Sequence, residues 1–290
     1  MRVFALSDLH ADHEANARWL EALSSQDYQG DALVVAGDVS HDLEIVARVL
    51  TALRRKFARV IFVPGNHELW VRRGEGRDSI AKFRRVLDLA VSLGVHVEPV
   101  RHAHGEAAVW IVPLFGWYTT PEEGRDTLYL PGPGPDVGLR GWLDLQFTRW
   151  SSLEGRPPAE YFLSLNEPCL ARRYDAPVLS FSHFLPRREL MFRDGPPLAR
   201  AGPPRSPRRG FNFSRVAGST GLERQLRQLG ATAHVYGHQH RNRRRALDGV
   251  LYLSHCLGYP RERLEGSIGD VGAGPVPVWP TRATPEGHGG

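Results

Sequence analysis

Five short segments of this 290-residue chain combine aspartate, asparagine and histidine in ways that suit metal binding. In chain order they contain Asp8-Leu9-His10, Gly37-Asp38, Gly65-Asn66-His67-Glu68, His183 and His238-Gln239-His240. Each segment alone has an ordinary explanation, since an aspartate often caps a helix, a Gly-Asn pair often forms a turn, and a lone histidine often lies in a core. Their chemistry therefore depends on whether the fold brings all five together.

Each of the five segments directly follows a short apolar run that is typical of a buried strand. The runs are RVFALS, ALVVAG, VIFVPG, PVLSFS and AHVYG. In open sheets of parallel strands, ligands bind beyond the carboxyl ends of the strands, where the loops converge. Because five polar strand ends at one sheet edge would be an improbable coincidence, we expect a shared metal site there.

The first hundred residues alternate between strand and helix patterns. We expect strands over RVFALS, DALVVAG and RVIFVPG, helices near 13–25, 43–57 and 78–93, and a further strand over VHVEPV at 95–100. This order is typical of βαβ units with right-handed crossovers and a largely parallel sheet. The continuous apolar strands indicate burial on both faces, as in an α/β fold.

The later part of the chain is less regular. AAVWIVPLFGW, PVLSFSH, AHVYG and the hairpin RRRALDG–VLYLSHC continue the core, with a helix near 214–230. Residues 119–175 are expected to form an insertion at the rim, with helices near 141–152 and 161–174, and residues 186–215 a basic Pro- and Arg-rich loop. We expect one domain over residues 1–265 and an irregular Gly/Pro-rich tail over 266–290.

The composition is typical of a soluble globular protein, with 41% hydrophobic and 24% charged residues and no apolar run long enough to cross a membrane. The first residues resemble neither a signal nor a transit peptide, and only Cys169 and Cys256 are cysteines, so we expect a cytoplasmic protein with two buried, reduced thiols. The net charge of +5 comes mostly from arginine, which suits phosphate binding but is equally explained by GC-rich coding. The sequence carries no nucleic-acid-binding signature and leaves the oligomeric state open.

Carboxylate, amide oxygen and imidazole together suit first-row metals such as Mn, Fe or Zn better than Ca. A central carboxylate can bridge two ions, and Asp38 is the natural candidate. Asp8, His10 and one histidine of GHQH would then serve one ion, and Asn66, His183 and the other histidine the second. Two ions about 3.5–4 Å apart form the arrangement used to hydrolyse phosphate esters.

The ordered series DxH, GD, GNHE, H and GHxH, over residues 8 to 240, resembles the calcineurin-like metallophosphoesterases. The resemblance implies a four-layer αββα sandwich with two mixed sheets and a dinuclear metal centre. It also implies ligands for the first ion at Asp8, His10, Asp38 and His240, and for the second at Asp38, Asn66, His183 and His238. His67 matches the family's catalytic histidine, which is not a ligand.

The activity implied by this resemblance is hydrolysis of a phosphomonoester or phosphodiester by in-line attack of a metal-bridging hydroxide, with His67 facing the departing alkoxide. Some relatives of this fold have lost ligands and act as non-catalytic scaffolds or protein-binding modules. That alternative predicts gaps in the ligand set. Because this sequence fills every ligand position, we expect an enzyme.

The second motif departs from the protein phosphatases of this family, which read GDxxDRG where this chain reads GDVSHDL. His41 replaces the added aspartate and no arginine follows it, which argues against a protein phosphatase. Asp42 and Glu68 are candidates to orient His67, although each can equally begin a helix or be a surface charge. His41 and His255 are further candidates to support the ligands.

The substrate class is left broad, as a phosphorylated small molecule or nucleotide. A basic lid would favour polyanions, but the same arginines are equally explained as a solvated loop; they are Arg187, Arg188, Arg205, Arg208 and Arg209. Three aromatic residues could stack on a base, although core packing is the better expectation; they are Phe115, Trp117 and Tyr118. We expect three histidines at the surface, namely His102, His104 and His288.

Overall fold

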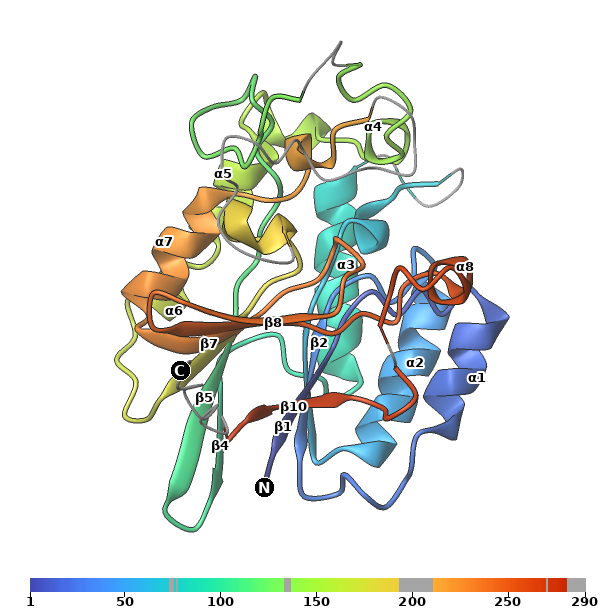
Figure 1. Ribbon diagram of the computed structural model, residues 1–290, viewed down its shortest axis with the longest axis vertical. Helices are drawn as coiled ribbons and strands as arrows, with labels where there is room; N and C mark the ends of the chain where they lie inside the picture. Colours follow the sequence, from blue (N-terminus) through green and yellow to red (C-terminus); the bar gives the residue numbers. More distant parts are fainter. Residues whose placement is uncertain (73–75, 77, 133–136, 193–210, 270, 281–290) are drawn as a thin grey trace, which may run out of the picture.

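The computed structural model describes residues 1–290 except 73–75, 77, 133–136, 193–210, 270 and 281–290 (Figure 1). Two sheets pack face to face, and helices cover the outer face of each sheet. The expected four-layer αββα sandwich with two mixed sheets is therefore confirmed.

The first sheet has the strand order β10-β1-β2-β3. Its strands are β1 (Val3–Leu6), β2 (Ala32–Ala36), β3 (Arg59–Val63) and β10 (Val276–Trp279). β1, β2 and β3 are parallel, whereas β10 pairs antiparallel with β1 at the edge. Three helices cover the outer face, namely α1 (Glu14–Ala22), α2 (Leu43–Lys56) and α3 (Ser79–Ser92).

Helix α2 illustrates how the sequence specifies these covering helices. Asp42 begins the helix by accepting hydrogen bonds from the backbone N–H groups of Glu44 and Ile45. Val46, Val49, Leu50 and Leu53 are buried at helical spacing. Basic residues follow in the last turn, where the helix dipole favours positive charge. The helix therefore presents one apolar face to the sheet.

The second sheet has the strand order β4-β5-β6-β7-β9-β8. Its strands are β4 (Val100–His104), β5 (Ala107–Pro113), β6 (Val178–Phe181), β7 (Ala231–Val235), β8 (Arg243–Leu247) and β9 (Val250–Ser254). The four central strands are parallel, and β4 and β8 pair antiparallel at the edges. The remaining helices are α4 (Asp144–Phe147), α5 (Pro158–Ser164), α6 (Glu167–Leu170), α7 (Thr220–Gln228) and α8 (Pro260–Leu264).

The space between the two sheets is filled by aliphatic side chains from both, such as Val34, Ile61, Ile111 and Leu179. In β1, for example, Val3 and Ala5 point into this space, whereas Phe4 and Leu6 point towards the helices. Burying a side chain of this kind contributes about 1.5–3 kcal/mol. This dry core fixes the two sheets relative to one another, and with them the strand ends that carry the site.

Two expectations, one of a strand and one of an irregular tail, were wrong. Residues 95–100 do not form a strand, because Pro99 lacks a backbone donor; only His96 bridges to Ile61, and β4 begins at Val100. The tail is not irregular throughout, since β10 pairs with β1, and an edge position tolerates Pro277. Residues 281–290 lie outside the described part.

The insertion contains shorter helices than expected. In place of a helix over 141–152, α4 has four residues and a separate 3₁₀ turn covers Ser151–Leu153. The helix expected over 161–174 is divided into α5 and α6, where Pro168 falls at the start of the second helix. Within the described residues, no helix is long and apolar enough to cross a membrane.

Several single-residue expectations were also settled. His102 is buried with 4% exposure, so its surface assignment was wrong, while His104 is exposed and His288 lies outside the described residues. Cys256 is buried and Cys169 is half-buried, and both are free thiols. Trp117 and Tyr118 are buried in the core and Phe115 packs against it, so core packing, the better expectation, is confirmed.

Candidate metal centre

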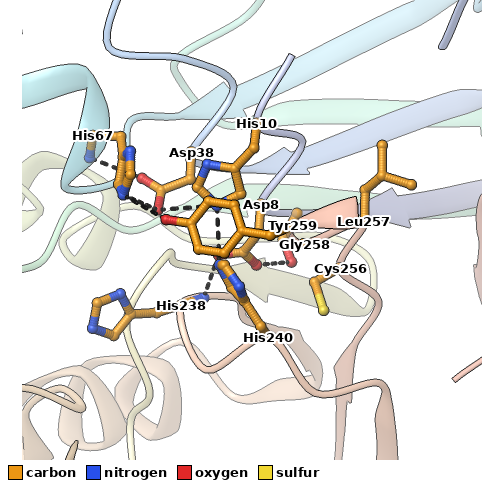
Figure 2. A network of polar contacts seen from close by, with 12 residues as sticks. Asp8, His10, Asp38, His67, His238, His240, Cys256, Leu257, Gly258 and Tyr259 are labelled. Atoms are coloured by element: carbon orange, nitrogen blue, oxygen red, sulfur yellow. Dashed lines mark hydrogen bonds and ion pairs between the residues drawn. The ribbon is translucent and has the colours of Figure 1, made fainter. Parts of the chain in front are cut away.

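The ends of β1, β2 and β3 in one sheet and of β6 and β7 in the other meet at one edge, and the expected ligands lie together there. Figure 2 shows Asp8, His10, Asp38, His238 and His240 among them. Two groups of side chains offer converging donor atoms that lie within 4.8 Å of one another; they are Asp8, His10, Asp38 and His240, and Asp38, His183 and His238. All of these residues are buried. Asp38 belongs to both groups, which is the arrangement that a bridging carboxylate requires.

The backbone at this edge is unusual. Within the described residues, seven non-glycine residues have positive φ angles, and five of them are candidate ligands, namely Asp8, His10, Asp38, His238 and His240. Such conformations cost on the order of 1–3 kcal/mol each and persist where function needs them. Gly65 permits the close approach, because a Cβ there would lie 2.2 Å from Oδ1 of Asp38. The loops are therefore shaped for the site at the expense of stability.

Three of the histidines are held by an acceptor on one ring nitrogen. Nδ1 of His183 donates to the carbonyl of Ala36 at 2.9 Å, and Nε2 of His238 donates to that of Val216 at 2.9 Å. Nδ1 of His240 donates to Oε2 of Glu262 at 2.6 Å. Because one ring nitrogen of each histidine points at its acceptor, the other faces the site, and once it is without a proton it supplies the lone pair that a metal ligand needs. These side chains therefore fit a metal centre.

Asn66 completes the second group. Its Oδ1 lies 3.0 Å from Nε2 of His183, and its Nδ2 donates to Oδ1 of Asp144 at 2.9 Å. Since a carboxylate only accepts, the amide nitrogen must face Asp144 and the amide oxygen must face the histidine. Asn66 thus presents the oxygen that suits a hard or borderline cation.

Neighbouring carboxylates shift the pKa values of His240 and Asp38 in the first group. Burial alone would lower the pKa of His240, but the carboxylates of Asp8 and Glu262 raise it to about 10. Burial raises the pKa of Asp38 well above its usual range, and the nearby charges of Glu68 and Asp8 add to this. The concentrated negative charge that retains a proton here would also favour a metal cation.

The other histidines at this edge share the opposite shift. Burial lowers the pKa values of His10, His67, His183 and His238, and the charges of neighbouring histidines lower them further. These rings are therefore neutral near pH 7, which is the form that coordinates metals or exchanges a proton.

His67 lies beside the two groups and is held in place by its neighbours. Its backbone N–H donates to Oδ1 of Asp38 at 2.9 Å, and its ring Nε2 lies 3.9 Å from Oδ2 of the same residue. Its ring stacks on Trp70, with centroids 3.8 Å apart and an interplanar angle of 28°. The sequence did not identify the residue that orients His67, and in the structure Trp70 contacts its ring.

The two residues proposed to orient His67 have other contacts. Asp42 caps α2, which was its alternative explanation. Glu68 is buried and accepts four backbone N–H bonds, from Asp38, Val39, Ser40 and Gly65. Burial raises its pKa to about 7 against the effect of these bonds. Glu68 therefore shapes the loops that carry Asp38 and Asn66.

The remaining candidates lie further out. Nδ1 of His41 lies 3.8 Å from Oδ1 of Asp12, and its ring faces Trp70 with centroids 6.4 Å apart. Nε2 of His255 contacts the carbonyl of Gly274 at 3.0 Å, so this side chain faces the tail. His41 is thus an indirect neighbour of His67.

Only part of the basic loop is described. Arg187 pairs with Glu189 and Asp248, and Arg188 donates to the carbonyl of Thr127. Three arginines lie outside the described residues, namely Arg205, Arg208 and Arg209. Of the five arginines named for a basic lid, the two that are described are thus bound to protein groups.

Sequence reasoning missed three supporting residues. Asp144, in the insertion, is 1% exposed and accepts hydrogen bonds from Asn66, from Nε1 of Trp70 at 2.7 Å and from Nε1 of Trp142 at 2.9 Å. Tyr259 and Glu262 follow β9 and contact the first group. The end of β9 is one more strand end at the same edge, so extending that criterion past His255 would have found Tyr259; no local pattern marks Asp144.

A family model described as calcineurin-like phosphoesterase matches residues 1–242, which is most of the chain. The chain therefore belongs to the calcineurin-like phosphoesterases and is a metal-dependent hydrolase of phosphate esters. Among curated proteins it is similar to the acyl-carrier-protein phosphodiesterase PptH of Mycobacterium tuberculosis, with 30% identity over 297 positions that cover 90% of this chain and 78% of the relative.

The fold has a solved counterpart. The crystal structure of the phosphopantetheinyl hydrolase PptH from Mycobacterium tuberculosis matches with a TM-score of 0.77, covering 98% of this chain and 97% of that chain at 24% identity. This likeness supports the sandwich fold and the order of its elements. The expected family, fold and enzyme class are thus confirmed.

Proposed function

We propose that this chain hydrolyses the phosphodiester that links a phosphopantetheinyl group to an acyl carrier protein, using two divalent or mixed-valence ions of Mn, Fe or Zn. The observation that carries the substrate is the similarity over 90% of the chain to a relative named an acyl-carrier-protein phosphodiesterase. A cytoplasmic location is part of this proposal and is supported by the use of only two cysteines, both of them free thiols.

The ligand assignment rests on the two side-chain groups that share Asp38. Asp8, His10 and His240 would complete one ion, and Asn66, His183 and His238 the other. When bound, such ions activate water and neutralise charge on the phosphoryl oxygens. The protein's own contribution is to fix the ligand nitrogens through Ala36, Val216 and Glu262.

His67 is proposed as the group that faces the departing oxygen. Its Nε2 lies 3.9 Å from Oδ2 of Asp38, and stacking on Trp70 fixes the plane of the ring. The edge of the ring that carries Nε2 can therefore contact the substrate. A neutral imidazole can donate a hydrogen bond from Nε2 to the departing oxygen as the P–O bond breaks. Removing this ring should therefore lower turnover and leave metal binding intact.

A diester fits this site better than a protein phosphomonoester. The stretch GDVSHDL lacks the arginine that the resembling protein phosphatases use to grip a phosphate. Asp42 stands at the position of that arginine and caps α2, and His41, at the position of the added aspartate, lies beside Asp12. A diester carries one negative charge fewer than a monoester dianion and needs less positive charge around it.

The direct test incubates the protein, loaded with Mn, Fe or Zn, with carrier protein that bears the phosphopantetheinyl group. Mass spectrometry should detect loss of the phosphopantetheinyl mass from the carrier, and the Asp38→Asn variant should be inactive. p-Nitrophenyl phosphate and its bis ester serve as comparison substrates. Turnover of the bis ester without any loss from the carrier would contradict the substrate and leave the diesterase activity standing; preference for the monoester would contradict both.

A further inference from the structure

Tyr259 lies inside the candidate metal centre, although it comes from a segment beyond the residues that the family model matches. Its ring lies against His10, with centroids 4.5 Å apart, and against His240, with centroids 4.9 Å apart. Its hydroxyl oxygen lies 3.5 Å from Nε2 of His67 (Figure 2). One side chain thus joins the first ligand group to the catalytic histidine.

The segment that carries Tyr259 is fixed to the first ligand loop. The backbone N–H of Leu257 donates to the carbonyl of Ser7 at 3.0 Å, and that of Gly258 donates to the carbonyl of Asp8 at 2.8 Å. Nδ2 of Asn16 donates to the carbonyl of Gly258 at 2.8 Å. Tyr259 is therefore held in register with Asp8 before any substrate arrives.

Gly258 permits this close approach. Its φ is +60°, and a Cβ at this position would lie 2.1 Å from Cδ1 of Ile268 and 3.0 Å from Oε2 of Glu262. A larger residue would be strained by its backbone conformation and would also displace the following segment. The sequence Gly258-Tyr259 thus brings the phenol to the metal edge at little steric cost.

Glu262 couples Tyr259 to a candidate ligand. The same oxygen, Oε2, accepts from Nδ1 of His240 at 2.6 Å and from the backbone N–H of Tyr259 at 2.9 Å. One carboxylate therefore sets the tautomer of His240 and the position of Tyr259 together. The phenol and the first ion would be aligned by a single group.

The position of the hydroxyl indicates chemistry rather than packing alone. Filling the space between His10 and His240 requires only the ring, which phenylalanine would also supply. The 3.5 Å separation from His67 is at the outer limit of a hydrogen bond, and such contacts often tighten when substrate binds. A phenol is a neutral donor near pH 7, so it can serve an oxygen that gains negative charge.

We propose that Tyr259 is a further catalytic residue, whose hydroxyl donates a hydrogen bond to the departing oxygen of the phosphate ester beside His67. As the oxygen of water bonds to phosphorus and the ester P–O bond breaks, the electron pair of that bond moves to the departing oxygen. This oxygen accepts hydrogen bonds from Nε2 of His67 and from the hydroxyl of Tyr259, both of which keep their protons, and it takes a proton from solvent after release. This inference rests on phosphoester hydrolysis at this site and holds for whichever ester is the natural substrate.

The test compares Tyr259→Phe with the unchanged protein on two diesters that differ only in the leaving group, methyl p-nitrophenyl phosphate and methyl phenyl phosphate. The poorer phenolate leaving group needs more help, so kcat for the phenyl ester should fall about 10- to 100-fold with little change in KM. Turnover of the p-nitrophenyl ester should fall by less than about threefold, because p-nitrophenolate delocalises its negative charge onto the nitro group and needs less stabilisation at the departing oxygen.

Two controls separate catalysis from structure. Tyr252→Phe removes a hydroxyl that donates to Glu223, away from the site, and should leave both rates unchanged. The metal content of Tyr259→Phe should equal that of the unchanged protein. An equal loss on both esters, unchanged turnover of both, or a loss of metal would each overturn the proposal.

Failure of the Tyr259 proposal can be distinguished from failure of the proposed diesterase function. If the unchanged protein turns over neither diester but hydrolyses monoesters, the diesterase assignment is wrong and the Tyr259 proposal is not. The same comparison is then made with phenyl phosphate and p-nitrophenyl phosphate, where the same unequal loss is expected. Equal losses on these two monoesters would again overturn the role of Tyr259.

Discussion

The two candidate metal groups share Asp38, but they are supported by different parts of the chain. The first group is backed by Tyr259 and Glu262, which follow β9 near the end of the described chain. The second is backed by Asp144 from the insertion and by the carbonyls of Ala36 and Val216. The candidate ligands come from strand ends that carry the motifs, whereas the supporting side chains come from segments without any motif.

This difference indicates that the candidate ligands depend on the fold, whereas the supporting side chains depend on the segments that surround the site. A ligand position is set by the strand that precedes it, so it belongs to the sandwich. Asp144 also accepts a hydrogen bond from Trp70, which stacks on His67, and therefore links the insertion to the proposed catalytic histidine as well as to Asn66. The insertion is thus part of the site and does not merely lie at its rim.

Removal of the shared carboxylate should have the largest effect. Asp38→Ala takes a donor from both groups, so we expect turnover of any phosphate ester to fall by at least about 10³-fold, given the several kcal/mol that metal ions supply to such reactions. Steady-state assays with saturating Mn would measure this. Residual activity above a few per cent would show that Asp38 does not bridge.

Removal of a candidate ligand that belongs to only one group should affect the metal ion of that group only. His240→Ala should lower the metal content from two ions per chain to one by weakening the first group, and His238→Ala should do the same to the second. Metal analysis after dialysis gives the stoichiometry, and a chelator titration gives the affinity. If either variant lost both ions, the two halves would not be separate sites.

The two supporting carboxylates, Glu262 in the first group and Asp144 in the second, allow the two metal groups to be compared through smaller changes. Glu262→Gln and Asp144→Asn each replace a carboxylate by an amide of the same shape, and changes of this kind cost about 10- to 100-fold in metal affinity or activity. We expect Glu262→Gln to weaken the ion at His240, and Asp144→Asn the ion at Asn66. Measured in a His238→Ala background, which retains the first ion, only the Glu262 change should lower metal affinity further.

The sequence predicted which candidate ligands lie together because a polar residue after an apolar run is a local signal. Asp8, Asp38 and His183 each follow a buried strand, and parallel strands must end at one edge. Asn66 and Asp144 are 78 residues apart, and no sequence pattern near Asp144 predicts its hydrogen bond to Asn66. Supporting residues of this kind are specified by tertiary packing.

The same distinction explains the errors in the fold. A four-residue strand such as β10, interrupted by Pro277, has too short a pattern to be recognised without its partner β1. His102 alternates with exposed residues in VRHAH, and burial of one polar side chain depends on the sheet behind it. Long, apolar strands and amphipathic helices such as α2 were predicted correctly because their periodicity is local.

The smallest effect is expected for the residue that the structure assigns to helix capping. Asp42→Ala removes the cap of α2 and should lower the free energy of unfolding by about 1 kcal/mol. Because Asp42 bonds to Glu44 and Ile45, we expect kcat to stay within about twofold of the unchanged protein, as for other sites away from the reacting atoms. Urea denaturation and steady-state kinetics test the two parts, and a large loss of kcat at normal stability would return Asp42 to the group that orients His67.

The central claim is that Asp38 joins two metal sites of different support, and anomalous diffraction from crystals grown with Mn tests it most directly. The account predicts two anomalous peaks on either side of Asp38. One peak should contact Asp8, His10 and His240, and the other Asn66, His183 and His238. A single peak, or two peaks that do not share Asp38, would contradict the account.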